Sequence, residues 1–446
     1  MKNFLNTLSN IWKIEDLRVR IINTLLFLLI YRVGCVVVLP GVDPASLNSH
    51  AKEGLLGLLN MFAGGAFSRA SIFALGVMPY ISASIVVQLL GIAVPYFTKL
   101  QKEGESGQNK INQWTRYLTI GITALQAIGY LKTQVSPDAR LIGDPFFTIL
   151  NVFVLTSGTL FVMWLGERIT DKGIGNGISL IIMAGIIAQL PSAFVTEFIN
   201  RTTGNGGLVT FIVELVALIG VVMFTILIVQ GTRKIAVQYA KRIVGNKQYG
   251  GVRQYIPLKV NAAGVMPIIF AQAIMFIPAY IPSLFPSVAA NATVMALANY
   301  NSWLHNLLFA ILIILFTYFY TAITVNPNQM ADDMKKNGGF IPGVKPGMAT
   351  ASFIDDIISK ITLPGSIALA IIAVIPAVAS MIGVSAPFAR FFGGTSLIIL
   401  VGVILDTLQQ IESHLLMRHY DGLMKTGRIK GRTAITSTAG STPPVI

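Results

Sequence analysis

Ten stretches of about twenty apolar residues run through this chain, separated by short polar segments. An α-helix rises 1.5 Å per residue, so a stretch of this length crosses the hydrocarbon core of a bilayer. Of the 446 residues, 54% are hydrophobic and only 12% are charged, against about 25% charged in soluble domains. The sequence therefore predicts an all-α integral membrane protein with ten transmembrane helices, at residues 21–39, 72–94, 114–131, 146–165, 178–195, 208–230, 262–283, 303–324, 364–383 and 395–416.

Lysine and arginine are unevenly distributed between the two sides that these spans define. With the N-terminus inside, 26 of the 33 basic residues fall in inner segments and six in outer ones. Cytoplasmic loops of membrane proteins carry such an excess of basic residues. The pattern predicts a multi-pass protein with both termini in the cytoplasm.

A half-length apolar segment precedes the second span. Residues 55–63 are too few to cross a bilayer, and a break containing Gly64, Gly65, Ser68 and Arg69 follows them. Irregular backbone at membrane depth is tolerated only where it is buried in protein or lines a water-filled cavity. We therefore expect a pore with a short re-entrant helix folded into it.

Ten spans divide into five and five, and a repeat with an odd number of spans must be inverted relative to its partner. Two inner loops are longer than topology requires, and the loop at 231–261 has seven basic and no acidic residues. Such a loop favours contact with phosphates or an acidic surface. The predicted organisation is an interfacial segment 1–20, an N-terminal half 21–199, a hinge loop 200–207, a C-terminal half 208–416 with large loops 231–261 and 325–363, and a tail 417–446.

The motifs of common enzyme classes are missing from the sequence. There is no GxxxxGK[ST] loop for nucleotide hydrolysis, the four histidines lack metal-ligand spacing, and Cys35 is the single cysteine. We expect no catalytic residue, metal or cofactor. A small-solute secondary transporter remains an alternative, but it needs ionisable groups that converge within the membrane, whereas Arg32, Glu214 and Asp406 are scattered.

Several long strings carry a family resemblance, in order and at the expected spans and loops: NMFAGGAFSRASIFALGVMPYISASI, MWLGERITDKGIGNGIS, PLKVNAAGVMP, GGFIPGVKPG and FGGTSLIILVGVILD. Over nearly its whole length the chain resembles the SecY family of protein-conducting channels. The resemblance implies two inverted five-helix halves around an hourglass pore in the bacterial cytoplasmic (inner) membrane. The implied function is translocation of unfolded secretory polypeptides and lateral release of their hydrophobic segments into the bilayer.

The resemblance also assigns residues to the closed pore. An aliphatic ring at its waist corresponds to Val77, Ile81, Ile178, Ile182, Ile269 and Ile399. A plug that seats on the ring corresponds to Leu55, Leu56, Leu58, Leu59, Met61 and Phe62, with Gly64 and Gly65 as its link. Polar residues at the sideways opening, or lateral gate, correspond to Ser82, Gln126 and Asn261. A narrow aliphatic constriction excludes water and ions by dewetting.

The partners that the resemblance implies are SecE-like and SecG-like small membrane subunits, the SecA ATPase, the ribosome, signal peptides with unfolded polypeptides, and membrane lipids. The surfaces that contact SecA or the ribosome correspond to Arg233, Lys234, Lys241, Arg242, Lys247 and Lys345. Many relatives have arginine at the last of these positions. Lysine keeps the charge but lacks the planar guanidinium fork, so only a charge contact is expected there.

Overall fold

The computed structural model describes residues 12, 14–47, 54–203, 207–239, 242–244, 247–249, 253–284 and 292–426. Lys241 lies outside these residues, and for Leu55, Leu56, Leu58, Arg242 and Lys247 only the backbone is described.

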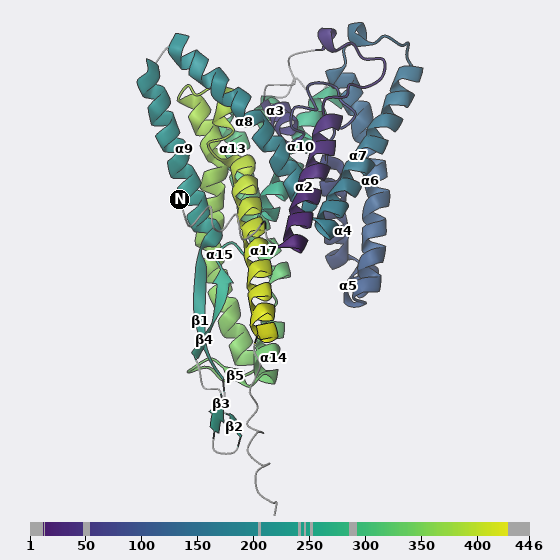
Figure 1. Ribbon diagram of the computed structural model, residues 1–446. Coiled ribbons are helices and arrows are strands. Elements are labelled where there is room, and N and C mark those ends of the chain that lie inside the picture. Colours follow the sequence, from purple (N-terminus) through teal and green to yellow (C-terminus); the bar gives the residue numbers. More distant parts are fainter. Residues whose placement is uncertain are drawn as a thin grey trace, which may run out of the picture.

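The helices form two groups that meet along α8 (Figure 1). The first group comprises α2 (Glu15–Gly34), α4 (Met78–Ala93), α6 (Glu105–Gln134), α7 (Phe146–Lys172) and α8 (Gly177–Thr203). The second comprises α9 (Gly207–Gln230), α10 (Met266–Leu284), α13 (Trp303–Thr324), α15 (Met348–Met381) and α17 (Gly394–Thr426). Helix α8 packs against both α9 and α17, and α10 packs against α4. Short helices complete the framework at α3 (Gly54–Phe62), α5 (Pro95–Lys102), α12 (Ala292–Ala298) and α16 (Ala386–Ala389), with 3-10 turns at Pro44–Ser46 and Pro137–Ala139.

Many of these helices have the length and composition of membrane spans. Among the described residues, six helices qualify, and α4 with α5 forms a seventh candidate that is bent by 102° at Pro95. Helices α2, α6 and α10 occupy the other predicted positions, but α2 carries three arginines and α6 is interrupted by polar residues. The chain is therefore a multi-pass membrane protein, and the count of ten spans stays a prediction.

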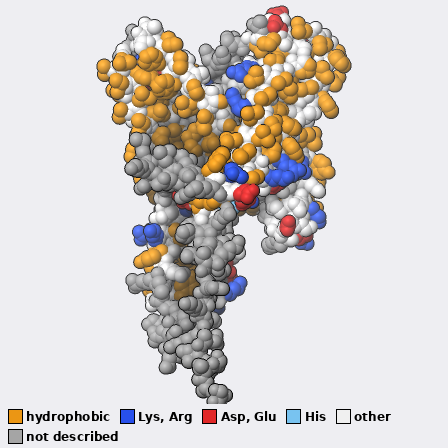
Figure 2. All heavy atoms as spheres, in the orientation of Figure 1, with side chains coloured by type: hydrophobic (Ala, Val, Ile, Leu, Met, Phe, Trp, Pro, Cys, Tyr) orange, Lys and Arg blue, Asp and Glu red, His pale blue; other side chains and the backbone are white. Residues whose placement is uncertain are grey.

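The outer surface of the helices is apolar. The most apolar 18 residues of α9 have a mean hydropathy of 2.9, yet only 11% of them are buried. Figure 2 shows hydrophobic side chains spread over both groups of helices. Apolar residues that face outward along a long helix are explained by contact with lipid.

The second predicted span begins later than expected. Its helix starts at Met78 rather than at residue 72, and residues 72–77 form turns. Two positions here have the left-handed backbone, Ala70 at φ 46° and Gly76 at φ 55°. Pro79 then occupies the first turn of α4, where a proline is well tolerated because its missing N–H would be unpaired in any case. The apolar composition alone did not reveal this break.

A β-ladder extends beyond the helices, and the all-α prediction omitted it (Figure 1). Strand β1 (Thr232–Tyr239) pairs antiparallel with β4 (Arg253–Lys259), with Thr232 opposite Lys259, and with the short β5 (Gly339–Phe340). Between them, β2 (Arg242–Val244) pairs with β3 (Lys247–Tyr249). Ile235 and Val237 alternate inward and pack with Met334 of α14 (Pro327–Lys336) and with Ile354 of α15. The two long inner loops therefore fold together into one unit.

Candidate functional site

Four aliphatic side chains from four different helices meet between the two groups. Ile81 of α4, Ile182 of α8, Ile269 of α10 and Ile399 of α17 line one cavity of about 10 Å³, which Phe62 at the end of α3 also lines. A cavity of this size holds one water molecule at most. The arrangement is a nearly closed apolar constriction at the place where the groups join.

The other two predicted ring residues do not line this cavity. Val77 is buried at the start of α4, one turn before Ile81. Ile178 lies in the first turn of α8 and packs beside Gly166 of α7, where an added Cβ would meet the Ile178 side chain at 2.8 Å. The structure therefore brings together four of the six predicted residues.

The predicted plug forms α3, and side chains from three helices donate hydrogen bonds to the main chain around it. Gln189 of α8 donates to the Asn60 carbonyl at 2.7 Å, and Arg32 of α2 donates to the Gly64 carbonyl at 3.0 Å. Tyr130 of α6 donates its hydroxyl to the Phe67 carbonyl at 2.7 Å. All three donors belong to the first group of helices, so α3 and its link are fixed to that group.

Glycine is required at two kinds of position around α3. Gly64 and Gly65 have φ of +63° and +88°, a region that residues with a side chain rarely adopt. Gly185 of α8 faces the Phe62 carbonyl, and an added Cβ would approach its oxygen to 2.5 Å. Leu59, Met61 and Phe62 of α3 are buried.

The three predicted lateral-gate residues are not joined to one another by hydrogen bonds in the part of the chain that the structure describes. Ser82 donates to the Met78 carbonyl of its own helix at 3.1 Å. Gln126 is half-buried on α6. Asn261 is buried in the turn before α10, and its Oδ1 has no hydrogen-bond partner among the described residues. Their role at a lateral gate stays a prediction.

The basic residues with described side chains lie on the unit beyond the helices. Arg233 and Lys234 are exposed on β1. Lys345 is exposed shortly after β5, and Thr350 donates to its carbonyl at 2.9 Å. Because β5 pairs with β1 at Phe340 and Gln238, the strands that carry both basic segments belong to one sheet.

A buried ion cluster joins the end of α8 to the second group of helices. Arg201 pairs with Glu197 at 2.8 Å and with Glu214 of α9 at 2.5 Å, and it donates to the Gly383 carbonyl at 2.7 Å. Glu197, whose side chain is 1% exposed, also accepts from the Ser385 N–H at 3.0 Å. Both carboxylates pair with the same guanidinium at one edge of the structure instead of converging on the central cavity.

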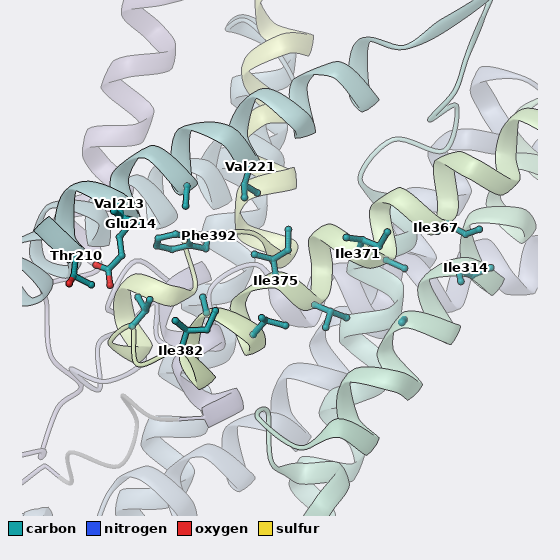
Figure 3. Close-up of a pocket in the computed structure, with 17 residues that line it drawn as sticks. Thr210, Val213, Glu214, Val221, Ile314, Ile367, Ile371, Ile375, Ile382 and Phe392 are labelled. Carbon is teal, nitrogen blue, oxygen red and sulfur yellow. The ribbon is translucent and has the colours of Figure 1, made fainter. Parts of the chain in front are cut away.

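A larger cavity of about 670 Å³ lies within the second group alone, between α9, α13 and α15. Figure 3 shows Thr210 and Glu214 at one end of it and Ile314 and Ile367 at the other. Among the described residues, Glu214 is the one charged residue in its lining. The larger cavity is separate from the constriction, because the two share no lining residue in the described part of the chain.

Three residues of the constriction were not predicted for it. Met78, Gln272 and Thr395 complete the lining of the small cavity. Helical spacing is the signal that could have found them, since each lies three or four residues from Ile81, Ile269 or Ile399 on the same helix face. Among the described residues there is no cluster of metal-binding side chains.

Burial raises the pKa of Tyr300, in the loop before α13, to about 12. The nearby Arg390 guanidinium opposes this rise, because a positive charge favours the phenolate. Arg390 also lies against Gly57 of α3, where an added Cβ would come within 2.2 Å of its Nη2 atom.

Comparisons with known proteins agree on one family. The SecY family model matches residues 71–408. The protein translocase subunit SecY of Streptomyces coelicolor is 42% identical over 444 residues, covering 94% of this chain and 100% of the relative. The subunit of the same name from Mycobacterium bovis is 43% identical over 434 residues, covering 92% and 97%.

Solved structures share the fold at low sequence identity. One described as a protein conducting channel has a TM-score of 0.65 and 18% identity, over 92% of this chain and 95% of the other. Another, described as Sec61 in a canine ribosome-channel complex from the endoplasmic reticulum, has a TM-score of 0.60 and 17% identity over the same shares.

Proposed function

The chain belongs to the SecY family and is a protein-conducting channel subunit, not an enzyme, and we propose that its pore closes at Ile81, Ile182, Ile269 and Ile399. Unfolded polypeptides pass between the two groups of helices, and hydrophobic segments leave sideways into the bilayer. The single observation that supports this pore most strongly is the meeting of four aliphatic side chains, one from each of four helices, around about 10 Å³.

Aliphatic lining suits a channel whose substrate varies in sequence. A narrow apolar constriction dewets and so blocks ions, yet it forms no lasting bond to a side chain that slides through. We assign Val77 and Ile178 to the same ring, one helical turn from Ile81 and Ile182 on their helices. In this proposal α3 is the plug, Gly64 and Gly65 are its link, and Ser82, Gln126 and Asn261 line the lateral gate.

The two groups of helices correspond in this proposal to two inverted halves of five spans each, with residues 200–207 as the hinge. Both termini lie in the cytoplasm, in the bacterial cytoplasmic (inner) membrane. The excess of basic residues in the inner segments supports this orientation.

In this proposal an external motor drives transport, which agrees with the lack of a nucleotide-hydrolysis motif in the sequence. The unit built on β1, β4 and β5 presents Arg233, Lys234 and Lys345 to SecA or the ribosome, and Lys241, Arg242 and Lys247 belong to the same surface in this proposal. SecE-like and SecG-like membrane subunits complete the channel.

Cysteine crosslinking tests the pore assignment directly. In a Cys35→Ser background, Ile81→Cys is combined with a secretory polypeptide that is stalled in transit and carries one cysteine. We expect a disulfide between that cysteine and position 81, since the translocating chain must pass the constriction. Val216→Cys on α9, which is 65% exposed and is not among the residues that line the larger cavity, serves as the control and should form none. Equal crosslinking at both positions, or none at position 81 while transport proceeds, would overturn the assignment.

A further inference from the structure

Gln272 is one of two polar residues, with Thr395, in a mostly apolar constriction. It lies one turn after Ile269 on α10, its side chain lines the same small cavity, and the residue is 3% exposed. Its Nε2 atom has no hydrogen-bond partner in the part of the chain that the structure describes. Phe62 of α3 lines the same cavity.

An unpaired buried amide has a clear energetic consequence. A donor that is buried without an acceptor loses its hydration and gains nothing in return, so the state that buries it is destabilised. Native proteins contain few such groups, and each one calls for an explanation. A methionine of similar length would fill the same space with no unpaired donor.

We propose that Gln272 favours opening of the channel by leaving its amide unpaired when the constriction is closed. In an open pore, water or a peptide carbonyl of the passing chain accepts its N–H, so the penalty applies to the closed state alone. A ligand or signal can shift a two-state equilibrium only by a difference in free energy between the states, and this amide supplies part of that difference. The inference rests on the proposed position of the pore, and it adds a residue that sets how easily the pore opens.

The test compares Gln272→Met and Gln272→Leu with the unaltered channel, each reconstituted with its small partner subunits in planar bilayers. The measurement is the concentration of a synthetic signal peptide that gives half-maximal ion conductance. We expect both variants to require at least about fivefold more peptide, the lower end of the effect of one unpaired buried donor. Gln88→Met is the matched control, because the Gln88 amide already donates to Ser84 at 3.5 Å, and it should leave the concentration unchanged.

The outcomes separate this inference from the proposed pore. If the unaltered channel conducts on addition of peptide and both variants match it or open more easily, the inference is wrong while the pore assignment stands. A shift in only one variant would indicate a packing effect and would also overturn the inference. If Ile81→Cys fails to crosslink as described above, the pore assignment itself fails.

Discussion

Gly185 is a residue at which the main chain of α8 approaches α3 and its link closely. A methyl group there would lie 2.5 Å from the Phe62 carbonyl oxygen and 3.1 Å from the Gly64 nitrogen. Both neighbours are main-chain atoms, so no flexible side chain can move aside to make room. The lack of a side chain at Gly185 thus allows α3 to pack against α8.

We predict that Gly185→Ala displaces the plug and raises ion leakage in the absence of substrate by severalfold. Overpacking of this kind typically costs about 1–3 kcal/mol, which is enough to shift a seated helix. Ion flux from proteoliposomes is the measurement. Gly220→Ala on α9 is the control, because no described atom outside the neighbouring backbone of α9 lies within 4 Å of the added methyl group there. Leakage equal to that of the unaltered channel would show that the plug does not seal at this contact.

At the scale of elements, the unit built on β1, β4 and β5 should bind its partner through its positive charges. We predict that Arg233→Glu combined with Lys345→Glu weakens binding of SecA or ribosomes about tenfold at physiological salt, because exposed charges steer association. The difference should shrink as salt rises, since a Debye length of about 8 Å at 0.15 M shortens further.

The control for this charge reversal is Lys132→Glu. Lys132 is an exposed lysine in the last turn of α6, outside the unit of β1, β4 and β5. Cosedimentation of the partner with proteoliposomes measures binding in each variant. An equal loss from Lys132→Glu would indicate a general effect of net charge, and unaltered binding of the double variant would refute the assigned surface.

Elements differ in how far the sequence predicts them. The long apolar helices follow from composition, and α7, α8, α9 and α13 lie where the hydropathy places them. The sequence did not predict the β-ladder, because its inward residues pack against partners that are distant in the chain. Ile235 and Val237 of β1 contact α14 and α15, which lie about a hundred residues further along the sequence. The bend at Pro95 lay at the end of a predicted span and was taken for its boundary.

The sequence likewise predicted some residues of the candidate site and not others. Matching of strings identified Ile81, Ile182, Ile269 and Ile399, which the structure brings to one cavity. It could not find the donors to the plug, because Gln189 and Tyr130 lie 129 and 63 residues away from the carbonyls they bind. Their pairing depends on how α6 and α8 pack, which no local pattern encodes.

At the scale of the whole molecule, the Arg201 cluster fastens the first group of helices to the second. We predict that Arg201→Met destabilises the protein by about 3–5 kcal/mol, because two buried carboxylates lose their common cation. Thermal unfolding in detergent measures this change. Adding Glu214→Gln to the variant should recover part of the loss by removing one of the two charges.

Arg116→Met is the matched control for this prediction. Arg116 pairs with Glu167 at 2.7 Å, but the two side chains are 49% and 30% exposed. Exposed pairs contribute about 0–1 kcal/mol, so this variant should unfold near the unaltered temperature. A similar loss in both variants would mean that the Arg201 cluster is no more important than a surface pair.

The donors around α3 address carbonyl oxygens, and every residue type supplies the same carbonyl. Gln189 and Tyr130 therefore recognise the path of the main chain and not the identity of the residues at 60 and 67. Position 64 is different, because a side chain there would meet the Arg32 guanidinium that donates to its carbonyl. Mutational drift at 60 and 67 leaves the bonds from Gln189 and Tyr130 intact, whereas drift in these donors removes them. Selection acting through these bonds therefore constrains the donor residues more tightly than the side chains at 60 and 67. The sequence of a plug can diversify at such positions while the surrounding helices continue to hold its main chain.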